Sequence, residues 1–252
     1  MNYQSNRGDN CRRSAMLSER EKILELLRFG IEMGQIKDLD LLLERILTLA
    51  RTFVHADAGS IYVSDGDLLK FVQTQNETLT KRLAPGKKLV YHTFTVPIDN
   101  MSIAGYVANT GKLLNIPDVY HLPEDISYQF GRKFDQVANY KTHSMLTVPL
   151  STTQGVRIGV LQMINRLDSA NEIIPFSQED EYFIQYFANN AAVALDRAQM
   201  TRAIILRMIS MAKLRDPRET GAHVHRVGAY AVELYEAWAT SHNIDIVGLS
   251  QR

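Results

Sequence analysis

Residues 177–215 contain neither Pro nor Gly, and this long stretch constrains the fold more than any other part of the chain. It predicts one helix of roughly 58 Å at 1.5 Å per residue, which is longer than a compact domain needs. Ser177 is a suitable N-cap residue, and Pro217 ends the helical pattern. Apolar or small residues recur at steps of three and four, as in a coiled coil: Ile184, Phe187, Ala191, Ala194, Ala198, Thr201, Ile205, Met208 and Ala212.

The two halves of this predicted helix have different roles. The first half is expected in the core of a domain, whereas the second half extends beyond any core that the preceding residues can build. We interpret the second half as a connecting helix that pairs with a second copy in a parallel dimer. The pattern leaves open whether Ala191, Ala194 and Ala198 make contacts within one chain or across the dimer.

Charge and composition exclude several classes of protein. The chain carries 28 Lys and Arg against 28 Asp and Glu, a balance that provides no basic surface for nucleic acid or an anionic membrane. The single Cys, Cys11, permits no disulfide within the chain. No run of about 18 apolar residues occurs, and residues 1–16 lack the apolar segment of a signal peptide. We expect a cytoplasmic protein with no nucleic-acid or membrane partner.

The order of the predicted elements is that of an α+β domain. A polar tail over 1–16 is followed by a helix within 17–37, where Ser18 and Glu21 form a capping-box pair, and by a second helix over 39–55. Alternating residues on either side of Asp65-Gly66-Asp67 predict a β-hairpin. Further strands are predicted over 87–91, 93–97, 113–116, 144–150 and 157–165, with short helices over 102–110 and within 117–142. This order predicts an antiparallel sheet covered on one face by the terminal helices.

The middle of the domain is long and irregular. Segments such as residues 99–142 are uncommon in a compact domain unless they have a function. We expect the sheet to form the floor of a pocket and this segment to form its walls and lid. A pocket of that kind is suited to a small molecule.

Residues 102–118, 140–149 and 159–166 carry a family pattern, which ends in a spaced signature. Together they resemble the GAF domains of cyclic-nucleotide phosphodiesterases and bacterial adenylyl cyclases, over about residues 38–198. The resemblance implies that Arg166, which replaces a Lys of the family, pairs with Asp180. It also implies that the signature latches the fold near the pocket without touching the ligand. The signature residues are Asn165, Arg166, Phe176, Asp180 and Glu181.

The resemblance further implies a set of residues that contact a cyclic nucleotide, with no cofactor required by the GAF domain itself. A helix N-terminus among them suits a phosphate. The positions are Ser60 for the base, the backbone of Ile103 and Ala104 for the phosphate, Asp135 and Thr142 for the ribose and phosphate, Gln162 where an acidic residue often stands, and Tyr128 in the lid.

The chain departs from the family at three other positions of the expected pocket. Ala138 replaces a Thr that contacts the ligand, and Thr74 and Gln75 replace a Phe and an Asp that hold the base. The choice between cyclic AMP and cyclic GMP, or another ligand, therefore stays open.

Residues 214–231 contain Arg-Asp-Pro, Thr-Gly-x-His and the pair Glu219 and His223, which share one face of a helix at this spacing. These features resemble the start of an HD-GYP domain, a phosphohydrolase that hydrolyses cyclic di-GMP. The resemblance implies that Glu219 and His223 bind a divalent metal, such as Fe or Mn, in the full-length domain. Two ligands without the family's His-Asp dyad cannot complete a two-metal site, so this chain by itself is expected to be inactive.

These observations divide the chain into the tail (1–16), an N-terminal helix (17–37), a GAF domain (38–198), a connecting helix (199–216) and a truncated HD-GYP start (217–252). The first hypothesis is a regulatory module for a small effector, cyclic AMP or cyclic GMP. It would control the attached phosphohydrolase through a homodimer formed by the N-terminal and long C-terminal helices. The second is a ligand-free GAF domain that serves only dimerisation and signal transmission. The third, hydrolysis by this chain itself, conflicts with the missing dyad.

Overall fold

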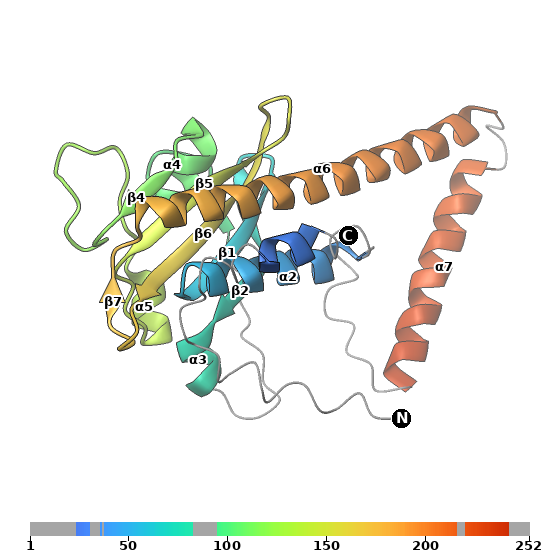
Figure 1. The fold of residues 1–252 in the computed structure, drawn as a ribbon. Coiled ribbons are helices and arrows are strands. Elements are labelled where there is room, and N and C mark those ends of the chain that lie inside the picture. Colours follow the sequence, from blue (N-terminus) through green and yellow to red (C-terminus); the bar gives the residue numbers. More distant parts are fainter. Residues whose placement is uncertain (1–23, 31–35, 37, 83–94, 216–219, 242–252) are drawn as a thin grey trace. The chain divides into compact units, whose positions relative to one another are not determined.

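The computed structural model of the chain describes residues 24–30, 36, 38–82, 95–215 and 220–241 (Figure 1). The predicted tail over 1–16 and the predicted strand over 87–91 lie outside the described residues, and of the predicted N-terminal helix residues 24–30 are described as helical. The chain forms two compact units, Met1–Ala198 and Gln199–Arg252.

An antiparallel sheet organises the first unit, as predicted. Its central pair joins β1 (Ala56–Asp65) to β6 (Arg157–Leu167), two strands that are far apart in the sequence. The strand order is β3-β2-β1-β6-β5-β4, and β7 pairs with β6. The other strands are β2 (Leu68–Asn76), β3 (Thr95–Pro97), β4 (Leu114–Ile116), β5 (Met145–Ser151) and β7 (Ile173–Ile174).

Helices lie on both faces of this sheet (Figure 1). We call the face covered by α2 and α6 the outer face, and the face on which α4 and α5 pack the inner face. The helices are α2 (Leu39–Phe53), α3 (Glu77–Arg82), α4 (Ile103–Thr110), α5 (Lys133–Ala138), α6 (Gln178–Arg215) and α7 (Thr220–Ser241). The α+β class and the long C-terminal helix are therefore confirmed.

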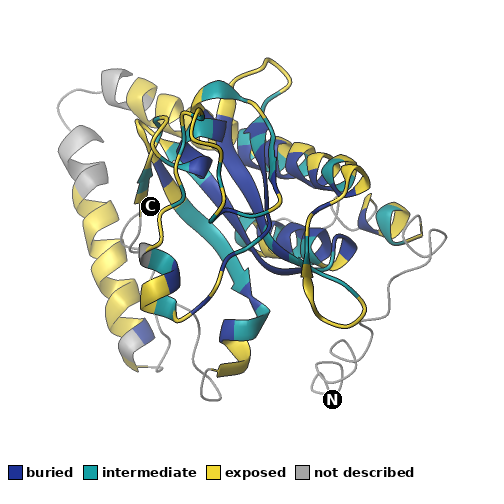
Figure 2. Ribbon diagram, turned by 90° about the vertical axis from the view of Figure 1, so that its left-hand side faces the viewer, coloured by how far each residue is buried: buried dark blue, intermediate teal, exposed yellow. Residues whose placement is uncertain are grey.

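The main core lies between the sheet and the outer-face helices (Figure 2). Ile46 of α2 and Ile184 and Phe187 of α6 are fully buried there, each contributing roughly 1.5–3 kcal/mol by removal from water. Ala191 is also fully buried in this core, which resolves one position of the predicted seam in favour of contacts within the chain. Phe29 of the helix over 24–30 packs on Phe187 with ring centroids 5.4 Å apart.

The described residues of the second unit are helical and expose apolar side chains. The last part of α6 exposes residues of the predicted seam, including Ile205 and Met208. Helix α7 exposes Tyr230, Leu234 and Trp238. Among the described residues of this unit, these side chains belong to no hydrophobic core cluster.

Two short elements were not predicted from the sequence. Helix α3 follows β2 directly, because the side chain of Asn76 accepts a hydrogen bond from the Leu79 N–H at 2.8 Å and so starts the helix. The two-residue strand β7 pairs with the end of β6. Helix α3 has six residues and β7 has two, so neither element is long enough to show a periodic pattern in the sequence.

Candidate functional site

A cluster of buried polar side chains occupies the centre of the inner face. Ser60 of β1 stands directly opposite Gln162 of β6 in the sheet register, so these two predicted site residues are neighbours. The Tyr62 hydroxyl donates to Gln162 Oε1 at 3.1 Å, and Gln162 Nε2 donates to Thr147 Oγ1 at 3.1 Å. Burial raises the pKa of Tyr62, so its hydroxyl remains a hydrogen-bond donor at neutral pH.

Thr74 extends this cluster onto β2, where it pairs in register with Ser60. Its Oγ1 atom is buried and has no hydrogen-bond partner among the described residues. A buried hydroxyl in this state costs about 1–3 kcal/mol of stability, so the position is suited to accept a partner from a ligand.

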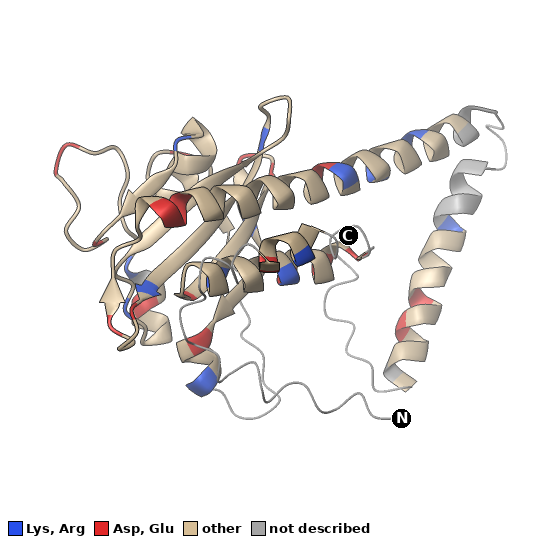
Figure 3. Ribbon diagram, viewed as in Figure 1, with Lys and Arg blue, Asp and Glu red and all other residues tan. Residues whose placement is uncertain are grey.

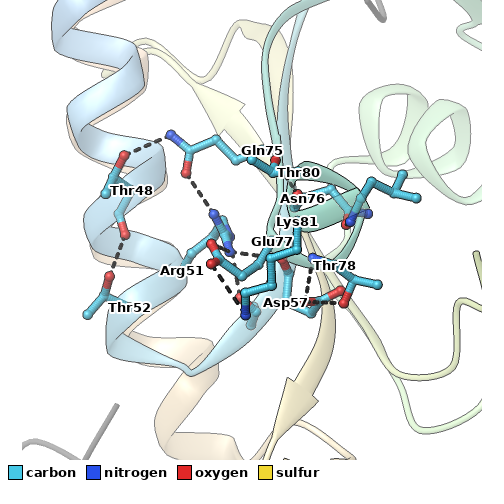
Figure 4. Close-up of polar contacts among 12 residues, drawn as sticks. Thr48, Arg51, Thr52, Asp57, Gln75, Asn76, Glu77, Thr78, Thr80 and Lys81 are labelled. Atoms are coloured by element: carbon cyan, nitrogen blue, oxygen red, sulfur yellow. Dashed lines mark hydrogen bonds and ion pairs between the residues drawn. The ribbon is translucent and has the colours of Figure 1, made fainter. Parts of the chain in front are cut away.

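Gln75, the other position where the family binds the base, faces away from the site. Its Nε2 donates to Thr48 Oγ1 at 2.7 Å, and its Oε1 accepts from Arg51 at 3.0 Å, both on α2 (Figure 4). Successive side chains of a strand point to opposite faces, so Thr74 and Gln75 cannot both line one pocket. Of the two departures at the base position, only Thr74 lies on the inner face.

Asp135 of α5 and Thr142 are joined by two hydrogen bonds. The Thr142 N–H donates to Asp135 Oδ2 at 2.7 Å and the Thr142 hydroxyl donates to Oδ1 at 2.8 Å, and both residues are buried. The Tyr120 hydroxyl donates to the same Oδ2 atom at 2.8 Å, and this hydrogen bond raises the pKa of Tyr120. The two residues predicted to contact ribose and phosphate are thus brought together, but in this structure they satisfy each other.

The start of α4 lies beside the segment that carries Tyr128. Ser102 caps the helix by accepting from the Gly105 N–H at 3.0 Å, and Ile103 and Ala104 follow in its first turn. Tyr128 packs on Tyr106 of α4 with ring centroids 4.9 Å apart. The structure therefore places the predicted lid aromatic against the predicted phosphate-binding helix.

Aromatic side chains also cover parts of the inner face. Phe134 of α5 packs in a cluster with Ala58 of β1 and Phe71 of β2, and Phe130 packs in a cluster with Ile103. A ligand that contacts both Ser60 and Asp135 would have to share this space with them.

The signature residues form the expected ion pair. Arg166 Nε lies 2.7 Å from Asp180 Oδ2, the same oxygen that accepts from the N–H and the hydroxyl of Ser177 at the start of α6. Glu181 accepts from Asn115 at 2.8 Å, which ties α6 to β4. Phe176 is buried in the main core. These contacts hold α6 to two strands of the sheet.

Asn165 connects the end of β6 to the residues around Thr142. It has a positive φ of 55°, a conformation that Asn adopts more readily than most residues. Its side chain accepts from the His143 N–H at 2.7 Å and donates to the Lys141 carbonyl at 2.8 Å and to the Tyr140 hydroxyl at 3.0 Å. The signature therefore fixes the segment beside the candidate site.

Sequence reasoning missed the residues that support these contacts. Asp57, buried at the start of β1, accepts from the Tyr140 hydroxyl, and its backbone carbonyl accepts from Arg51 at 2.8 Å (Figure 4). Tyr62 and Tyr120 were also missed. An acidic residue inside the otherwise apolar start of a strand was the one signal that singled out Asp57.

Only one of the two predicted metal ligands lies among the residues that the structure describes. Glu219 lies outside the described residues, and His223 belongs to α7. Among the described residues, no group of three or more His, Cys, Asp or Glu could hold a metal ion. In the same part of the chain, none of the helices combines the length and apolarity that a membrane crossing requires.

The family model of the GAF domain matches residues 38–195. A dual 3′,5′-cyclic-AMP and -GMP phosphodiesterase 11A of Takifugu rubripes is 29% identical over 197 residues, which cover 74% of this chain and 19% of that protein. A cGMP-specific 3′,5′-cyclic phosphodiesterase of Drosophila sechellia is 28% identical over 198 residues, covering 75% of this chain and 15% of that protein. The chain thus spans less than a fifth of the length of these relatives.

Solved structures share the fold. The GAF domain of a phosphoenolpyruvate-protein phosphotransferase from Coxiella burnetii has a TM-score of 0.55 at 21% identity, covering 74% of this chain and 99% of that one. The corresponding domain from Acinetobacter has a TM-score of 0.54 at 16% identity, covering 74% of this chain and 99% of that one.

Proposed function

Because the chain belongs to the GAF domain family, we propose that it is a regulatory module that binds a small molecule, a cyclic nucleotide, on the inner face of its sheet. The observation that carries the proposal is the polar cluster of Ser60, Thr74 and Gln162 on three adjacent strands, with Thr74 Oγ1 buried and without a partner among the described residues. A base edge offers donors and acceptors that match such a set of hydroxyl and amide groups.

Binding requires a rearrangement of the α5 segment. Asp135 and Thr142 are both buried in this structure, so ribose and phosphate reach them only if the residues that cover them move. A ligand that contacts both Ser60 and Asp135 would also share the inner face with Phe134. A ligand shifts this equilibrium only by its difference in affinity for the two arrangements, and that difference is the source of regulation.

The output of this module is proposed to be an attached HD-type phosphohydrolase, reached through a dimer of the connecting helix. The exposed Ile205 and Met208 of α6 support a helix that pairs with a second copy. In a complete HD domain, Glu219 and His223 would supply two ligands to a divalent metal that activates water. The described part of this chain provides no full ligand set, so no catalytic step is assigned to it.

A second candidate function is dimerisation and signal transmission without a ligand. The observation that favours it is the filling of the inner face by Phe130 and Phe134, together with the paired state of Asp135 and Thr142. If this candidate holds, the polar cluster is part of the core and the domain acts through its helices alone.

Calorimetry on the purified chain separates the two candidates. Cyclic AMP, cyclic GMP and cyclic di-GMP are titrated in turn, with 5′-AMP as a non-cyclic control. The proposal predicts saturable heat and an increase in Tm with at least one cyclic nucleotide. The absence of both with all three would leave the dimerisation candidate.

A matched pair of variants locates the site. Gln162→Met removes an amide from the inner face, whereas Gln73→Met removes one from the outer face, where it bonds to the Asp40 carbonyl at 3.2 Å. We expect Gln162→Met to weaken binding by about tenfold or more and Gln73→Met to leave it unchanged. Equal losses in both variants would contradict a ligand site on the inner face.

A further inference from the structure

A separate cleft lies on the other side of the segment that carries Thr142. It has a volume of about 440 Å³, within the range of small-molecule sites. On the ribbon, Lys and Arg positions lie beside α5, with acidic positions close to them (Figure 3). The lining residues are Asp118, Tyr120, His121, Arg132, Lys141 and His143.

Residues 141–143, which lead into β5, separate this cleft from the inner face. Thr142 is buried against Asp135, while its neighbours Lys141 and His143 both line the cleft. Neither Thr142 nor the residues of the polar cluster line the cleft. The cleft is thus distinct from the polar cluster around Ser60 and Gln162.

Charge in the cleft favours an anion. Arg132 and Lys141 are cationic, and of the six lining residues Asp118 alone is acidic. The Asp118 carboxylate is already engaged, since its Oδ2 lies 2.8 Å from His121 Nδ1 and 3.5 Å from His143 Nδ1, and its Oδ1 accepts from the Tyr120 N–H at 2.9 Å. Both histidine contacts use Nδ1, which leaves the Nε2 atoms to face another partner.

We propose that this cleft binds the phosphate group of a small molecule. The Arg132 guanidinium is held 5.0 Å over the Tyr120 ring, and this stacking presents a planar fork of donors that matches phosphate oxygens. Lys141 adds a point charge, and the two imidazoles add donors when protonated. Two cationic side chains beside one carboxylate that already has hydrogen-bond partners suit an anionic group with several oxygens.

The cleft shares one wall residue with the network behind it. Tyr120 lies under Arg132 on the cleft side, and its hydroxyl donates to Asp135 Oδ2 at 2.8 Å. An anion that draws Arg132 away from the ring acts on the residue that helps to hold Asp135 and Thr142 together. Through Tyr120 an anion in the cleft would act on the residues of the inner face, an extension that rests on the proposed function.

Titration with inorganic pyrophosphate and inorganic phosphate at constant ionic strength tests the proposal. Calorimetry measures affinity, and the ¹H–¹⁵N resonances of the His121 and His143 rings report contact directly. We expect saturable binding of pyrophosphate with shifts of both histidine signals, and a Gln162→Met variant that binds pyrophosphate as the parent chain does. Loss of pyrophosphate binding in Gln162→Met would assign the anion to the inner face and overturn the proposal.

Matched double variants provide the control. Arg132→Ala with Lys141→Ala removes two cations from the cleft, and Lys70→Ala with Lys112→Ala removes two that do not line it. The first pair should weaken pyrophosphate binding by at least about tenfold and the second pair should not. Equal losses in both pairs, no saturable binding, or equally tight binding of citrate would each contradict a phosphate site. An unchanged Tm in each variant confirms that folding is intact.

Discussion

The Tyr140 hydroxyl donates a 2.7 Å hydrogen bond to Asp57 Oδ2 and accepts one of 3.0 Å from Asn165 Nδ2. Asp57 in turn accepts from the N–H and the hydroxyl of Thr78 at 3.2 and 2.9 Å (Figure 4). Strands β1 and β6 therefore meet at one phenol, and helix α3 joins them through Asp57. Burial and the neighbouring Asp57 charge raise the pKa of Tyr140, which keeps the phenol protonated and able to donate.

Tyr140→Phe should lower the free energy of unfolding by about 1–3 kcal/mol, because it leaves the buried Asp57 carboxylate and the Asn165 amide each short of a partner. Urea denaturation measures the change. Tyr182→Phe is the matched control, since Tyr182 is 69% exposed, and its effect should stay within about 0.5 kcal/mol. Equal effects in the two variants would show that the Tyr140 bond adds no stability.

Gly159→Ala should destabilise the fold by about 2 kcal/mol or more. A Cβ atom at Gly159 would overlap the backbone carbonyl of Tyr62 on the paired strand, and backbone in a central strand pair cannot give way cheaply. Gly131→Ala is the control, because nothing lies within 4 Å of a Cβ at that position. Thermal unfolding of the two variants should differ by several degrees, with Gly159→Ala the lower.

His121→Ala should raise the pKa of Asp118. The hydrogen bond from His121, followed by that from the Tyr120 N–H, holds this pKa below its ordinary value. A carboxyl whose pKa is lower in the folded state contributes stability above its unfolded pKa, and this contribution is lost as the pH falls through the folded pKa. NMR titration of the Asp118 carboxyl carbon measures the shift, and an unchanged midpoint in His121→Ala would exclude the hydrogen bond as its cause.

If α6 pairs with a second copy, charged substitutions on its exposed seam should change the mass of the protein in solution. Ile205→Glu with Met208→Glu places charges on the exposed seam of α6 and should reduce the mass from that of a dimer to that of a monomer. Val156→Glu with Ile173→Glu alters two exposed apolar residues of the first unit and should not change the mass. Sedimentation velocity distinguishes the outcomes. A parent chain that is already monomeric would contradict the dimer.

Local patterns were sufficient for most of the secondary structure. Asp65-Gly66-Asp67 predicts the turn between β1 and β2, and Gly66 has the positive φ of 59° that such a turn requires. The stretch without Pro or Gly became α6 over Gln178–Arg215. The three family stretches and the spaced signature from Asn165 to Glu181 together indicated the family, which the match over residues 38–195 confirms.

The candidate site was predicted less completely, because its contacts join distant parts of the chain. Alternation predicts that Thr74 and Gln75 face opposite sides of β2, but not which side carries the site. Asp135 and Thr142 were both named, yet their mutual hydrogen bonds depend on how α5 packs. Tyr62 and Tyr120 were missed, since no pattern near either residue indicates what its hydroxyl reaches.

The sequence by itself determined the antiparallel α+β class, the hairpins, the extent of the long helix and the family. These follow from periodicity, turn residues and short-range spacing, which act within a few residues. Only the tertiary structure decided that Ala191 lies in the core, that Phe134 covers part of the inner face, and that Lys141 and His143 line a cleft opposite Thr142. Side-chain direction and burial depend on which surfaces meet when the chain packs. The long helix was thus set by its own residues, and the division between its buried and exposed halves by the sheet on which its first half lies.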